Sequence, residues 1–168
     1  MELNDLEKID KKSMFKTYDI WPDIARESFE KKFEKLDVKD IDHVVFAGMG
    51  GSGSIGDAIS AILSKKDIHV SNVKGYLLPK TVDSKTLVIV TSVSGNTSET
   101  LAILNNAKQT TAKVVGFSSG GKIEEYCKKN EIFFQKIPMI HSPRASFTGF
   151  LYSILNVLEQ ILPIEKSE

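Results

Sequence analysis

Two short loops contain the residues of this chain that are best suited to bind an anion. Residues 48–53 read GMGGSG, and residues 92–97 read SVSGNT. Each loop follows a short apolar run and precedes a stretch with helical spacing. Such a loop exposes backbone N–H groups and the positive end of a helix dipole, and both favour a negatively charged group. The pair of loops therefore predicts one phosphate that is held from two sides.

Hydroxyl groups make the second loop the more specific indication of an anion-binding site. Three hydroxyls lie within six residues, on Ser92, Ser94 and Thr97, around a glycine that permits a tight turn. Together with backbone N–H groups, they can satisfy phosphate oxygens without a cationic side chain. A purely structural role is open as well, because Asn96 or Thr97 could cap the following helix, with Glu99 in its first turn.

Two nucleotide-binding motifs match the first loop only in part. Its glycines fit the dinucleotide fingerprint, which also needs an acidic residue about 20 positions later to bind the ribose. Residues 74–78, at the end of the second expected strand, contain no carboxylate. The spacing from Gly51 to Gly56 fits a nucleotide P-loop, but Asp57 stands where that motif needs a lysine. Both patterns are therefore disfavoured.

The elements that carry the loops alternate between strand and helix patterns. Short apolar runs predict strands at about 43–47, 68–76, 87–91, 114–117 and 132–134. Helical spacing predicts helices at about 52–63, after 97 to about 108, around Ile123 and Tyr126, and at about 145–161. This alternation predicts an α/β fold, a three-layer αβα sandwich with a five-stranded parallel sheet in the order 2-1-3-4-5. In that order the first and third strands are neighbours, so both loops border one crevice.

The ends of the chain are predicted to be helical. Before residue 40 there is no glycine, and apolar residues recur at helical spacing at Ile24, Ala25, Phe29, Phe33 and Leu36. We expect a helical segment, residues 1–40, to pack on a main domain formed by residues 41–168. The last helix is apolar around much of its circumference, which indicates either burial in the core or an interface with a partner.

Composition narrows the possible partners. The 168 residues include 22 basic and 22 acidic side chains, so charge provides no case for binding nucleic acid or a membrane surface. A single cysteine, Cys127, cannot form an intrachain disulfide, which favours a cytoplasmic setting. No apolar run approaches the roughly 20 residues of a membrane span. No cluster at metal-ligand spacing is present in the sequence, so we expect no metal and no other cofactor.

Three segments in order resemble the sugar isomerase (SIS) domain family. They are residues 46–53, residues 91–100 and residues 142–147, which read SPRASF, and within the family they are most similar to archaeal-type bifunctional phosphoglucose/phosphomannose isomerases. The resemblance implies a flavodoxin-like SIS fold and a sugar phosphate whose phosphate binds at Gly51, Ser52, Ser92, Ser94 and Thr97. It also implies that Arg144 faces the enediol intermediate, where a permanently charged guanidinium can stabilise developing negative charge.

The expected reaction is aldose–ketose isomerisation, between glucose 6-phosphate or mannose 6-phosphate and fructose 6-phosphate. It needs a base that moves a proton between C1 and C2. In the family the glutamate base lies in a second SIS domain, and no residue of this chain matches it. Glu99 is better explained as a charge in the first turn of a helix, Glu124 and Glu125 as part of a solvated helix face, and His141 as a loop residue. We therefore expect the base from a second SIS domain or from a homodimer partner, without which the chain would be inactive.

Two alternatives remain open at this point. The chain could be a single-domain enzyme similar to the hexulose-6-phosphate isomerases, which build their sites between subunits. It could also be a sugar-phosphate binding module that has kept the phosphate loops and has no base.

Overall fold

The computed structural model describes residues 3–33 and 36–162. They contain one sheet of five strands in the order β2-β1-β3-β4-β5, and every neighbouring pair is parallel. The strands are β1 (His43–Gly48), β2 (His69–Val73), β3 (Thr86–Ser92), β4 (Lys113–Ser118) and β5 (Phe133–Lys136). The α/β class and the strand order predicted from the sequence are confirmed.

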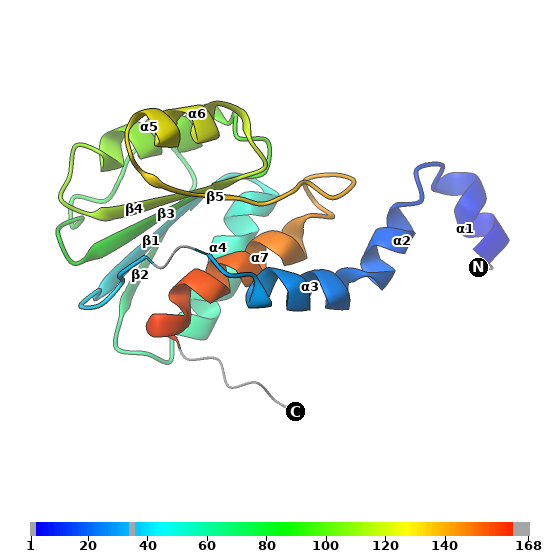
Figure 1. The fold of residues 1–168 in the computed structure, drawn as a ribbon, viewed down its shortest axis with the longest axis horizontal. Helices are drawn as coiled ribbons and strands as arrows, with labels where there is room; N and C mark the ends of the chain where they lie inside the picture. Colours follow the sequence, from blue (N-terminus) through cyan, green and yellow to red (C-terminus); the bar gives the residue numbers. More distant parts are fainter. Residues whose placement is uncertain (1–2, 34–35, 163–168) are drawn as a thin grey trace.

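Helices cover both faces of the sheet, as Figure 1 shows. On one face lie α4 (Gly51–Leu63) and α7 (Phe147–Val157), with α3 (Trp21–Glu30) packed along α7. On the other face lie α5 (Ser98–Ala107) and α6 (Gly121–Lys129). Because both faces are covered, every residue of β1 and of β3 is buried, which explains why these strands read as continuous apolar runs.

The remaining elements lie at the two ends of the described chain. The short helices α1 (Leu3–Ile9) and α2 (Met14–Asp19) extend away from the sheet, at the right of Figure 1. The 3-10 helix η1 (Leu158–Gln160) continues α7. Residues 74–85 between β2 and β3 contain no helix, as their length predicts. None of the described helices is both long and apolar enough to span a membrane.

Two details of the expected helices are wrong. The helix expected to include Phe33 ends at Glu30, because Lys31 takes up an extended backbone conformation. Phe33 still packs against the core from outside the helix, so its spacing reflected burial and not helical geometry. In α4, the spacing of Ile55, Ile59 and Ile62 predicts one buried stripe, but Ile62 is 44% exposed and the next residue, Leu63, is buried in its place. The division into residues 1–40 and 41–168 stays a prediction.

The core accounts for most of the apolar surface of α7. Phe150, Ile154 and Leu158 are fully buried, and they belong to a cluster that also contains α4 and sheet residues. On its outer side α7 meets α3, where the Asn156 side-chain amide donates a hydrogen bond to the Phe29 carbonyl. Of the two explanations left open by the sequence, burial within the chain is therefore sufficient for this helix.

A chain of hydrogen bonds joins the first residues of β1 and β3 to the middle of β2. Thr86 donates its hydroxyl proton to Asp83 (3.0 Å), so the 3.4 Å contact between Thr86 Oγ1 and His43 Nδ1 requires the imidazole N–H as donor. Neutral His43 can then accept a hydrogen bond from Ser71 through Nε2 (3.0 Å). Burial of His43, followed by the nearby charge of His69, holds the pKa of His43 below its ordinary value. The folded protein therefore favours the neutral imidazole.

This preference predicts that acid weakens the fold. As pH falls below about 6.5, the unfolded chain binds a proton at His43 before the folded chain does, so the free energy of unfolding decreases. Above that pH the neutral His43 makes its full contribution to the free energy of unfolding. We expect urea unfolding followed between pH 7.5 and 5.5 to show this decrease, and His43→Gln to flatten it. His141→Gln, at an exposed loop position outside the hydrogen-bond chain, is the control. An equal slope in wild type and His43→Gln would contradict the prediction.

Candidate functional site

Both anion-binding loops lie at the carboxyl ends of adjacent strands. Gly48 of β1 pairs with Thr91 of β3, so the chain leaves the sheet at neighbouring points. The loops meet where the Val93 backbone N–H donates a hydrogen bond to Ser52 Oγ (3.4 Å). At Gly48 an added Cβ would lie 2.9 Å from the carbonyl carbon of Ser52, so the first loop folds tightly against the start of α4.

The three hydroxyls of the second loop form one cluster. Ser92 Oγ lies 2.9 Å from Thr97 Oγ1 and 3.5 Å from Ser94 Oγ. Ser92 is buried at 2% exposure, whereas Ser94 is exposed, so the cluster reaches from the end of β3 to the surface. Spacing in the sequence placed these hydroxyls near one another, and the folded loop brings them into hydrogen-bonding distance.

Neither of the residues considered as a cap for α5 caps that helix. Thr97 occupies the N-cap position without a side-chain hydrogen bond to the helix, because its hydroxyl contacts Ser92. The Asn96 side chain instead accepts a hydrogen bond from the Lys122 backbone N–H (3.2 Å), at the start of α6. The helix α4 also begins without a side-chain cap, at Gly50. Both helices thus begin beside the loops without a side-chain acceptor for their first N–H groups.

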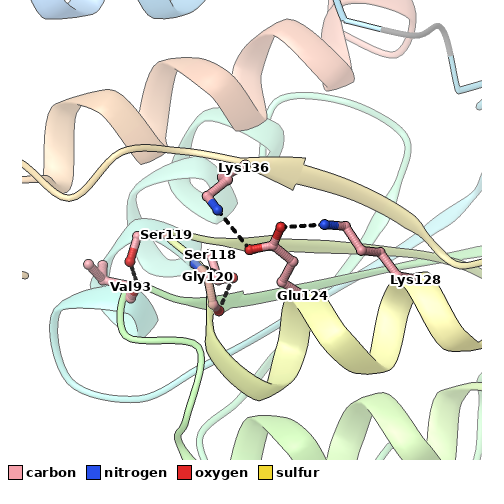
Figure 2. A network of polar contacts seen from close by, with 7 residues as sticks. All are labelled: Val93, Ser118, Ser119, Gly120, Glu124, Lys128 and Lys136. Atoms are coloured by element: carbon pink, nitrogen blue, oxygen red, sulfur yellow. Dashed lines mark hydrogen bonds and ion pairs between the residues drawn. The ribbon is translucent and has the colours of Figure 1, made fainter.

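The turn after β4 supports the second loop from the side, as Figure 2 shows. Ser119 Oγ donates a hydrogen bond to the Val93 carbonyl (2.6 Å). Gly95 has a left-handed backbone (φ 70°), and an added Cβ there would lie 1.7 Å from the Gly120 carbonyl oxygen. The second loop can therefore hold this conformation against the turn only with a glycine at position 95.

Glu124 next to this turn is engaged in ion pairs. Its carboxylate lies 2.7 Å from Lys128 Nζ and 2.9 Å from Lys136 Nζ, and Figure 2 shows it between these two side chains. Hydrogen bonds from Lys128 and then Lys136 hold the pKa of Glu124 below its ordinary value. These partners favour a structural role, since a group that is stabilised as a carboxylate is a weaker base.

Arg144 shares a cavity with the first loop. The cavity has a volume of about 500 Å³ and is lined by Trp21, Gly51, Ser52, Ser54, Pro143, Arg144 and Phe147. Arg144 lies on the turn before α7, and that turn is closed by Ser146, whose hydroxyl donates to the Ser142 carbonyl (2.9 Å) and accepts from the Ile140 N–H (2.8 Å). The fold therefore brings together two segments that are far apart in the sequence.

Trp21 is a cavity residue that reasoning from the sequence missed. In the sequence it stands only as the position before the first amphipathic helix, although it is the single tryptophan of the chain. Its Nε1–H donates a hydrogen bond to the Ala145 carbonyl (2.9 Å), directly after Arg144. Its rarity was the only signal in the sequence, and rarity alone does not place a side chain in a site.

The other titratable candidates lie outside this cavity. His141 contacts the Lys12 carbonyl through Nε2 (3.1 Å) and has a left-handed backbone (φ 57°). Among the residues that the structure describes, no carboxylate lines the cavity. Within the same residues, no three His, Cys, Asp or Glu side chains are grouped as metal ligands would be.

A basic residue, Lys74, directly follows β2, where a dinucleotide-binding domain would need an acidic residue to bind the ribose. Lys74 forms an ion pair with Asp57 of α4 (2.6 Å), and Asn72 donates a hydrogen bond to the same carboxylate (3.2 Å). Asp57, which occupies the position of the P-loop lysine, is thus engaged within the fold.

Comparison with known proteins identifies a family. The family model for the SIS domain matches residues 38–157. A bifunctional phosphoglucose/phosphomannose isomerase of Caldicellulosiruptor bescii is 43% identical over 109 residues, which are 64% of this chain and 32% of the relative. The enzyme of the same name from Aquifex aeolicus is 37% identical over 138 residues, 79% of this chain and 43% of the relative. The chain thus spans less than half the length of these relatives.

Solved structures show the same fold. The protein c3406 of Escherichia coli CFT073 superposes with a TM-score of 0.65 at 19% identity, covering 99% of this chain and 96% of that one. Glucosamine-6-phosphate deaminase of Thermotoga maritima gives a TM-score of 0.61 at 20% identity, covering 90% of this chain and 50% of that one.

The close approach at Gly95 predicts a large effect of a small substitution. Gly95→Ala should lower the free energy of unfolding by at least about 2 kcal/mol, because the new Cβ meets the Gly120 carbonyl and the backbone is left-handed. Gly75→Ala is the matched control, since a Cβ there meets no atom within 4 Å. Chemical denaturation measures both variants, and equal stabilities would show that the contact between loop and turn is not tight.

Proposed function

The chain belongs to the SIS domain family, and we propose that it binds a sugar phosphate for aldose–ketose isomerisation. The proposed substrates are glucose 6-phosphate and mannose 6-phosphate, which are interconverted with fructose 6-phosphate. The observation that carries the proposal is the meeting of three segments at one edge of the sheet. Ser52 contacts the hydroxyl loop through Val93, and Ser52 and Arg144 line the same cavity.

The phosphate is proposed to bind between the two loops, at Gly51, Ser52, Ser92, Ser94 and Thr97. The support is the hydroxyl cluster of Ser92, Ser94 and Thr97 beside two helices that begin without side-chain caps. Hydroxyls and helix N–H groups are good donors to phosphate oxygens, and a phosphate placed there would occupy the positive ends of both helix dipoles. This arrangement needs no lysine or arginine at the phosphate itself.

Arg144 is proposed to act on the other end of the substrate. When a base removes the proton from C2 of the aldose, negative charge develops on the oxygens of the enediol. A guanidinium next to those oxygens stabilises the charge and stays protonated at neutral pH. Arg144 is exposed on the cavity wall, and its side chain forms no hydrogen bond or ion pair within the described residues, so the guanidinium is available to a ligand.

The base itself is proposed to come from a second SIS domain or a second copy of the chain. The support is the lining of the cavity, which among the described residues includes no carboxylate. A homodimer and a second domain could both deliver a glutamate to the open side of the same site. A single-domain isomerase and a non-catalytic sugar-phosphate binding module are the competing proposals.

Activity and binding together separate these proposals. The purified protein is incubated with fructose 6-phosphate, and the formation of glucose 6-phosphate and mannose 6-phosphate is followed by NMR, while binding is measured by calorimetry. Conversion supports an isomerase. The oligomeric state of the purified protein then tells whether a second copy of the chain completes the site. Binding without conversion supports the binding module, unless a separately supplied SIS domain restores the reaction. The absence of binding would overturn the whole proposal.

The hydroxyl cluster generates a prediction about affinity. Ser94→Ala and Thr97→Ala should each weaken binding of fructose 6-phosphate by about 1–3 kcal/mol, because each leaves a phosphate oxygen without its partner. Calorimetric titration measures the change. Ser84→Ala, in the exposed turn before β3, is the control and should bind as the wild type does. If neither loop variant changes the affinity, the phosphate binds elsewhere.

Arg144 generates a prediction about rate. In a protein that converts substrate, Arg144→Ala should slow isomerisation by about 100-fold or more, because the charge on the enediol loses its partner. The dissociation constant of fructose 6-phosphate should change much less, since the phosphate contacts remain. Arg26→Ala removes the other arginine of the chain, which pairs with Asp23 on α3 (3.2 Å), and should leave the rate unchanged. A similar loss in both variants would argue against a specific role of Arg144.

A further inference from the structure

We infer that Trp21 is a positioning residue that holds Arg144 at the ligand cavity through the backbone of Ala145. This inference rests on the function proposed above. Trp21 and Arg144 line the same cavity, and the Trp21 indole N–H donates a 2.9 Å hydrogen bond to the Ala145 carbonyl. The two residues are far apart in the sequence, so the position of the Arg144 backbone depends on a contact that exists only in the folded chain.

Ala145 is a rigid point from which to hold the arginine. It is fully buried, and its backbone N–H donates a hydrogen bond to Ser142 Oγ (3.4 Å). The next residue, Ser146, closes the same turn through hydrogen bonds to Ile140 and Ser142. The turn is therefore fixed internally by serines and externally by Trp21, while the Arg144 side chain itself stays exposed.

Trp21 is in turn held in place from its own side of the molecule. Its ring lies edge-on to Tyr18, with ring centroids 4.7 Å apart and an interplanar angle of 82°. It begins α3, which packs along α7, the helix that follows the arginine turn. The same packing that joins α3 and α7 therefore sets the position of the indole relative to Arg144.

Loss of the Trp21 hydrogen bond should affect only the binding of the reacting end of a ligand. A misplaced Arg144 should weaken contacts to enediol oxygens, whereas the phosphate is proposed to bind residues of the two loops, and the Trp21 indole donates its hydrogen bond to Ala145 and not to them. A suitable probe is 5-phospho-D-arabinonate, because its carboxylate carries negative charge where the enediol does and its binding requires no base. Inorganic phosphate is the comparison ligand, since a phosphate bound at the two loops has no carboxylate or sugar oxygen to present to Arg144.

The test uses Trp21→Phe, which keeps an aromatic ring and removes the N–H donor. We expect this variant to bind 5-phospho-D-arabinonate about fivefold more weakly than the wild type, the effect of one ordinary hydrogen bond. Binding of inorganic phosphate should be unchanged. Tyr126→Phe, which removes a 2.9 Å hydrogen bond to Asn105 on the other face of the sheet, is the matched control and should change neither affinity.

A double-mutant cycle shows whether Trp21 acts through the arginine. In an Arg144→Ala background, Trp21→Phe should have no further effect on 5-phospho-D-arabinonate, because the group that it positions is gone. If Trp21→Phe fails to fold, 3-benzothienylalanine at position 21 keeps the bicyclic shape, replaces N–H by sulfur and gives the same comparison.

The outcomes separate this inference from the function on which it rests. If the wild type does not bind 5-phospho-D-arabinonate, the proposed function fails. If the wild type binds it and Trp21→Phe binds equally well, the inference is overturned and the function stands. Equal weakening of phosphate and 5-phospho-D-arabinonate, or an unchanged effect of Trp21→Phe in the Arg144→Ala background, also overturns the positioning role.

Discussion

The parallel pairing of β1 with β3 is the constraint on which the rest of the site depends. Gly48 pairs with Thr91, so the chain leaves both strands at the same edge of the sheet. The two strands are not consecutive in the sequence, and β2 lies on the far side of β1. The chain therefore leaves them in opposite directions, α4 toward one face and α5 toward the other, and the two loops between strand and helix contact each other at this edge.

Close backbone contacts then give that edge its shape. The first loop folds onto the start of α4 at Gly48, and the second loop rests on the turn after β4 at Gly95. Polar side chains follow the same arrangement, since Asn96 bonds to the start of α6 and Thr97 bonds to Ser92. Side chains that could have capped α5 are engaged elsewhere, which leaves the first N–H groups of that helix to a different acceptor.

A third segment adds a charge to this edge from the opposite end of the chain. The turn before α7 carries Arg144 to the cavity that Ser52 also lines, and Trp21 of α3 ties that turn to the N-terminal part of the described chain. The cavity and the core thus share contacts, because the packing of α3 on α7 supports the core and also places the indole at the cavity. The helix α3 precedes the alternating strands and helices that predict the fold, so this pattern does not place Trp21.

Much of this protein was determined by its sequence alone. Continuous apolar runs in β1 and β3, together with helical spacing between the strands, were sufficient for the fold class and strand order, because burial on both faces leaves a strong local signal. The sequence also predicted that Ser92, Ser94 and Thr97 lie close together, since they belong to one short loop. Only the tertiary structure decided where α3 ends, that Asn96 bonds to α6, and that Trp21 and Arg144 line one cavity. Those outcomes depend on contacts between residues far apart in the chain, which leave no periodic pattern in the sequence.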